Sequence, residues 1–250
     1  MTAASIPGRG GQQVVPRPPG TTRRRVAPWG VLADAERTVD VATVRARLAD
    51  LPTPQPSPID HADPREAAVL VPVVEVDGAA HIVFTKRPDS MEHHAGEISF
   101  PGGSREPGDA DLVATALRES REEIGLDPSR VDVIAQLDTM ATIASNFVIE
   151  PYVGIVSDLR GVAPDEREVE SILVIPVAEL LAPDTYVEEH WDMRAVRPDW
   201  AKRAVHFFEL PAAGYTHGQG ETIWGATARI LVTLLAHITG VVLDTPPALG

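Results

Sequence analysis

The stretch from Pro101 to Leu126 restricts the fold of this chain more than any other part of its sequence. It joins two consecutive glycines, Gly102 and Gly103, to a segment with the periodicity of an α-helix. The apolar side chains with helical spacing are Leu112, Val113, Ala116, Leu117 and Ile124. Asp109 or Asp111 suits the N-cap, and Gly125 suits the end of the helix. The sequence therefore predicts a glycine turn followed by an amphipathic helix that packs on a core.

Three carboxylates share one side of this predicted helix. Glu119, Glu122 and Glu123 stand at i, i+3 and i+4, and like charges so placed cost about 0.2–0.5 kcal/mol per pair. Mg²⁺ or Mn²⁺ would remove that cost, because these ions prefer carboxylate oxygen and also bind substrate phosphates. We therefore predict Glu119 and Glu123 as metal ligands, with Glu122 as a further or shared ligand. A solvated charged face, paired with Arg118 and Arg121, is the alternative interpretation.

The same stretch resembles the Nudix box of diphosphate hydrolases. That family pattern is Gly, five residues, Glu, seven residues, then Arg-Glu-x-x-Glu-Glu-x-Gly and an aliphatic residue. Residues 118–126 match its second half, but Asp109 replaces the first acid, eight residues separate it from Arg118, and Ser120 replaces an aliphatic residue. The resemblance implies an α/β fold, an α/β/α sandwich with a mixed central sheet.

Two further segments resemble the coenzyme A diphosphatase branch of that family. One is Val83-Phe84-Thr85-Lys86-Arg87, followed after eight residues by Gly96-Glu97-Ile98-Ser99-Phe100-Pro101-Gly102-Gly103; the other is Ile223-Trp224-Gly225-Ala226-Thr227-Ala228-Arg229. The matches span roughly residues 68–235. In the loop after Arg87 that branch usually has more basic residues, whereas this chain has Asp89, Glu92, His93 and His94. Trp224 is expected to pack in a core instead of stacking on a base.

The resemblance implies the hydrolysis of a diphosphate bond, which for coenzyme A would give 3′,5′-ADP and 4′-phosphopantetheine. Arg118 is expected to orient Glu122 or a neighbouring carboxylate. Glu168 is the candidate for the general base or a further metal ligand, because we expect it to open a strand; Glu170 is the alternative.

Arg87 is expected to bind phosphate, since arginine suits bidentate phosphate binding, and it is the candidate for the 3′-phosphate of coenzyme A. Gly102 and Gly103 are expected to let the backbone approach phosphate or metal. Two other functions stay open: hydrolysis of ADP-ribose, a dinucleotide or a damaged nucleotide, and nucleotide sensing without turnover. The presence of all three carboxylates favours catalysis.

The composition of the chain limits the kinds of molecule that it is expected to bind. The net charge of −14 and the sequence pI of about 4.9 argue against nucleic-acid binding and leave a small nucleotide as the expected partner. No apolar run reaches the ~18 residues of a membrane span, so no membrane partner is expected. The absence of cysteine fits a reducing compartment, and we expect the cytoplasm. A homodimer is compatible with the sequence.

Proline and glycine content predicts the organisation of the chain. Residues 1–30 hold few large apolar side chains, so we predict a disordered tail that is dispensable for catalysis. Residues 31–66 are predicted as a helix and a proline-rich linker, and residues 67–245 as a Nudix hydrolase domain. Within that domain, two apolar runs flank Asp77-Gly78 and predict a hairpin.

Overall fold

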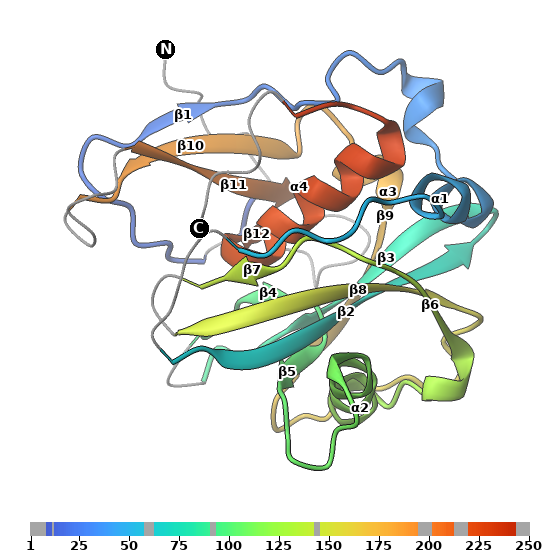
Figure 1. Cartoon of the computed structure of the whole chain (residues 1–250). Helices are drawn as coiled ribbons and strands as arrows, with labels where there is room; N and C mark the ends of the chain where they lie inside the picture. Colours follow the sequence, from blue (N-terminus) through green and yellow to red (C-terminus); the bar gives the residue numbers. More distant parts are fainter. Residues whose placement is uncertain are drawn as a thin grey trace. The chain divides into compact units, whose positions relative to one another are not determined.

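The computed structural model describes residues 9–11, 13–57, 63–90, 94–142, 146–194, 202–212 and 220–243. They form two compact units. Unit 1 comprises residues 1–37 and 178–250, and unit 2 comprises residues 38–177. Each unit contains a sheet of its own (Figure 1).

Unit 2 is built on an eight-stranded mixed sheet with the main order β4-β3-β2-β8-β6, in which β5 pairs with β2, β7 with β8 and β9 with β3. Its strands are β2 (Arg65–Val76), β3 (Ala79–Lys86), β4 (Ile98–Ser99), β5 (Gly102–Ser104), β6 (Val131–Gln136), β7 (Met140–Ala141), β8 (Phe147–Val156) and β9 (Ser171–Pro176). β2 and β8 run parallel, and the other strand pairs in the described part of this sheet are antiparallel. The predicted mixed sheet is confirmed.

The predicted hairpin corresponds to β2 and β3. Val76 and Ala79 close the ladder, and Asp77 and Gly78 between them both have positive φ, at 50° and 78°. Such a pair of residues makes the tight turn that matches the twist of the strands, which explains why Asp-Gly stands at this position.

Helices lie on both sides of this sheet (Figure 1). α2 (Leu112–Ile124) packs on β2 and β5, and its Ala116 and Ile124 join a core with Ala68 and Leu70 of β2. α1 (Val41–Leu48) packs on β2, β3 and β6 through its buried apolar residues, Val44 and Leu48. A short 3₁₀ turn, η2 (Pro128–Arg130), links α2 to β6. The expected α/β class with helices about a mixed sheet is therefore correct.

Unit 1 contains a four-stranded antiparallel sheet in the order β1-β10-β11-β12. Its elements are β1 (Thr22–Arg24), η1 (Asp34–Arg37), β10 (Tyr186–Asp192), β11 (Lys202–Leu210), β12 (Glu221–Trp224) and α4 (Gly225–Thr239). The short helix α3 (Val177–Leu180) stands at the boundary between the units in the sequence. α4 packs on β11 and β12.

The N-terminal segment differs from the predicted disordered tail. Thr22–Arg24 forms β1 on the edge of β10, and Trp29 is fully buried against the rings of Tyr186 and Phe208. The segment has few large apolar residues, and the ion pairs of its arginines and the buried ring of Trp29 hold it on unit 1. The two units meet in the sequence at residues 37/38 and 177/178, and the domain boundaries expected at 30, 66 and 245 stay predictions.

Candidate metal and substrate site

The site is organised by α2, whose ends lie where the sequence places them. The Asp111 side chain accepts a hydrogen bond from the Ala114 N–H at 2.7 Å, so Asp111 is the N-cap. Gly125 ends the helix at φ 66° and donates its N–H to the Arg121 carbonyl. These caps fix the helical turn that carries Glu119, Glu122 and Glu123.

The three carboxylates differ in burial as the periodicity predicts. Glu123 is only 7% exposed, the Glu119 side chain is 17% exposed, and that of Glu122 is 59% exposed. Glu123 therefore lies at the junction of helix and core, Glu119 at its rim and Glu122 toward solvent.

Gly102 and Gly103 bring β5 directly against these carboxylates. A Cβ on Gly103 would lie 2.6 Å from Cδ of Glu119, so only a residue without a side chain permits this approach. The backbone N–H of Gly102 lies near enough to the Glu123 carboxylate to lower its pKa. A Cβ on Gly102 would lie 2.3 Å from the Ala68 carbonyl oxygen of β2. Gly102 is thus required by close backbone contact, and Gly103 by the position of the Glu119 carboxylate.

Burial makes Glu119 and Glu123 of α2 hard to ionise. It raises the pKa of Glu123 to about 8, with the charge of Glu119 as the next cause and the Gly102 N–H opposing it. Burial also raises the pKa of Glu119. Oε2 of Glu123 is buried and has no hydrogen-bond partner among the described residues. A hard divalent cation fits this donor set, because it would satisfy that oxygen and favour both ionised forms.

Arg118 pairs with three carboxylates, those of Asp109, Glu119 and Glu122. It donates to both oxygens of Asp109 at 2.9 and 3.1 Å and to Glu122 at 2.9 Å, and it lies 3.0 Å from Glu119. Its Nη2 also donates to the Ser104 carbonyl at 3.0 Å. Arg118 in turn holds the pKa of Asp109 well below its usual range. The expected place of Arg118 beside Glu122 agrees with these contacts.

Sequence reasoning gave Asp109 no role beyond that of a candidate cap. Its contacts show that it anchors Arg118, and the only signal was its place at the first acid of the family pattern. Ser120, at an aliphatic position of the pattern, is buried and donates its hydroxyl to the Ala116 carbonyl at 2.7 Å. The buried hydroxyl is thereby satisfied, so serine is tolerated there.

Glu119 and Glu122 are paired with Arg118, so their carboxylates are not already arranged around a metal position. Among the described residues, no group of three acidic or histidine side chains converges in the geometry of metal ligands.

Glu168 lies outside the strand that we expected it to open. β9 begins at Ser171, and Glu168 stands in a turn where its N–H donates to the Asp165 carbonyl at 2.9 Å. Its exposed carboxylate nevertheless raises the pKa of both Glu119 and Glu123. Glu170 lies 4.0 Å from Lys86 instead. Of the two candidates, Glu168 is the one that acts on the carboxylates of α2.

Arg87 follows the end of β3. Its N–H donates to the Glu97 carbonyl at 3.0 Å, and its Nε is buried without a hydrogen-bond partner among the described residues. Its charge lowers the pKa of Glu123, which opposes the larger effect of burial. In the loop that follows, His94 contacts Glu97 at 2.7 Å. Glu92 and His93 lie outside the described residues.

The family model of the NUDIX domain matches residues 64–196. The chain is 39% identical over 189 residues to Nudix hydrolase 22, chloroplastic, of Arabidopsis thaliana, and the match covers 74% of this chain and 58% of that protein. It is 31% identical over 212 residues to the peroxisomal coenzyme A diphosphatase of Mus musculus, with 84% and 82% covered. The chain belongs to the Nudix hydrolase family.

The crystal structure of a MutT/nudix family protein from Enterococcus faecalis has a TM-score of 0.47 and 13% identity, with 79% of this chain and 68% of that chain covered. The chain spans less than two thirds of the plant relative's length. Within the described part of the chain, no helix is both long and apolar enough to cross a membrane.

Proposed function

We propose that this protein hydrolyses the diphosphate bond of coenzyme A or a derivative of it, with Mg²⁺ or Mn²⁺, to 3′,5′-ADP and (acyl-)4′-phosphopantetheine. The observation that carries metal-dependent hydrolysis is buried Glu123, whose Oε2 has no partner among the described residues and whose pKa is raised to about 8 beside Glu119. The choice of substrate rests on the segments that end at Arg87 and Gly103, and on the name of the mouse relative.

Glu119, Glu123 and Glu122 would hold the cation, which supplies charge neutralisation and a more acidic water when bound. Arg118, tied down by Asp109, positions Glu119 and Glu122. Glu168 takes a proton as the water oxygen bonds to one phosphorus. The bond from that phosphorus to the bridging oxygen breaks, and the departing phosphate keeps the electron pair.

Arg87, Gly102 and Gly103 would bind the phosphates. Because the charge of Arg87 reaches Glu123, we assign it to the diphosphate under attack instead of the 3′-phosphate. Arg87→Ala should then lower kcat/KM for coenzyme A and for dephospho-coenzyme A by the same factor, about 10-fold or more. A selective loss on coenzyme A would return Arg87 to the 3′-phosphate.

The proposal is tested by a panel of coenzyme A, acyl-coenzyme A, dephospho-coenzyme A, ADP-ribose, NADH and diadenosine polyphosphates, with products identified by mass. We expect the highest kcat/KM with coenzyme A or an acyl derivative and no turnover with a chelator. Faster hydrolysis of ADP-ribose or a dinucleotide would favour the alternative substrate class. The acid Asp89, which repels an added phosphate, is the feature that would explain this outcome.

We also propose a cytoplasmic location, on the cysteine-free sequence, and a small nucleotide as the partner. The homodimer stays a prediction, which light scattering on the purified protein would check. Fractionation of the source cells would check the location.

A further inference from the structure

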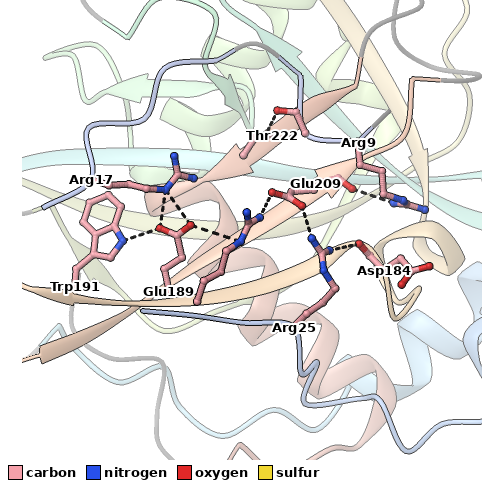
Figure 2. A network of polar contacts seen from close by, with 10 residues as sticks. Arg9, Arg17, Arg25, Asp184, Glu189, Trp191, Glu209 and Thr222 are labelled. Atoms are coloured by element: carbon pink, nitrogen blue, oxygen red, sulfur yellow. Dashed lines mark hydrogen bonds and ion pairs between the residues drawn. The ribbon is translucent and has the colours of Figure 1, made fainter. Parts of the chain in front are cut away.

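Three arginines of the N-terminal segment neutralise two buried carboxylates of unit 1 (Figure 2). Glu189 of β10 is 1% exposed, and Glu209 of β11 is 7% exposed. Arg17 donates its Nε–H to both oxygens of Glu189 at 2.9 Å, and Arg25 donates to Glu209 at 2.7 Å. Arg23 donates to Glu209 and lies 3.8 Å from Glu189, so it links the two.

Arg17 also lies on an aromatic surface. Its guanidinium is 5.2 Å from the ring centre of Phe207, which stacks on Trp224 at 6.4 Å. The indole N–H of Trp191 donates to Glu189 at 2.9 Å and so orients the carboxylate. A carboxylate beside an aromatic face is the environment that recognises a guanidinium.

The backbone of the segment is held as an added strand. β1 pairs antiparallel with β10, with Arg23 opposite Glu189. Nearer the N-terminus, the Gly10 N–H donates to the Leu210 carbonyl at 3.1 Å. The Thr222 hydroxyl donates to the Gly10 carbonyl at 2.6 Å. Strand addition at a sheet edge, with side chains in specific pockets, is a mode by which proteins bind extended peptides.

We propose that the β10-β11-β12 part of this sheet, with Glu189 and Glu209, is a binding surface for an extended arginine-rich peptide. The chain's own residues 9–30 are its built-in occupant. The contacts depend on the arginines and on the sheet edge, not on the covalent link through residue 31. The surface should therefore keep this segment after that link is cut, because its release would separate Glu189 and Glu209 from the arginines that neutralise them.

The test uses the full chain with a specific protease site between Gly30 and Val31, where Val31 is 87% exposed. After cleavage, we expect residues 1–30 to co-elute with residues 31–250 in size exclusion. The triple variant Arg17→Ala, Arg23→Ala, Arg25→Ala should lose the fragment. Arg24→Ala is the matched control, because Arg24 is exposed on the same strand; this variant should keep the fragment.

A labelled peptide of residues 9–30 provides a second measurement. We expect it to exchange into the cleaved protein, and the double variant Glu189→Gln, Glu209→Gln should bind it at least about tenfold more weakly. The proposal is overturned by release of the fragment from the cleaved wild type, by its unfolding, by equal retention in the triple variant, or by unchanged peptide affinity in the double variant.

Discussion

At the scale of single residues, Glu123 combines burial with a carboxylate oxygen that has no partner among the described residues. Without a cation, Glu123→Gln should stabilise the protein at neutral pH, because folding raises the pKa of Glu123 to about 8 and must protonate a carboxylate that is ionised in the unfolded chain. With Mg²⁺ or Mn²⁺, Glu119→Gln or Glu123→Gln should lower kcat by ~10²-fold or more, since metal-centred stabilisation supplies several kcal/mol. Thermal melts and initial rates, each with and without cation, measure the two effects. Unchanged kcat in both variants would reject these residues as ligands.

His206 of β11 is a second residue whose pKa is strongly shifted by its surroundings. Its Nδ1 contacts the Tyr186 hydroxyl at 2.7 Å, its Nε2 is buried, and burial lowers its pKa to about 4. The charge of Glu188 opposes this shift, while Arg229 and His190 add to it.

The folded protein should therefore lose stability as the pH falls. Between pH 6.5 and about 4 the unfolded chain binds a proton at His206 that the folded chain does not bind, so the loss should reach about 3 kcal/mol. His206→Gln should flatten this part of the curve of unfolding free energy against pH. A variant with the wild-type slope would show that other groups cause it.

At the scale of elements, Gly102 and Gly103 of β5 should respond differently to the same substitution. In Gly102→Ala the new Cβ meets backbone of β2, which cannot move away, so we expect a clear drop in melting temperature. In Gly103→Ala it meets only the mobile end of Glu119. The fold should survive while kcat falls about 10-fold or more, because Glu119 is displaced. Equal melting temperatures for the two variants would contradict this account.

The elements also show which parts of the fold could be predicted from local sequence. The helix of residues 112–124, its caps and the hairpin at Asp77-Gly78 were predicted because each depends on contacts within a few residues. The strand expected to begin at Glu168 exists, but its predicted start was wrong: Glu168 lies in a turn with Asp165, and β9 begins at Ser171.

At the scale of the whole molecule, the N-terminal segment belongs to unit 1, and its removal should cost stability. A chain that starts at Val31 lacks buried Trp29 and the arginine partners of Glu189 and Glu209. Removing one partner of a buried ion pair costs about 3–5 kcal/mol, so the melting temperature should fall by at least about 6 °C. This replaces the expectation of a dispensable tail. A truncated chain that melts with the wild type would restore that expectation.

The sequence by itself determined the carboxylate helix, the glycine turn before it and the mixed α/β class, because periodicity, capping and turn chemistry act over a few residues. Only the tertiary structure decided the effect of the Glu168 charge on the pKa of Glu119 and Glu123, and the docking of the N-terminal segment. Arg17 and Glu189 are 172 residues apart in the chain, and Arg25 and Glu209 are 184 apart. A local sequence pattern does not indicate a partner at such a distance. The composition of the segment therefore predicted disorder, whereas charged residues far away in the chain hold it in an ordered structure.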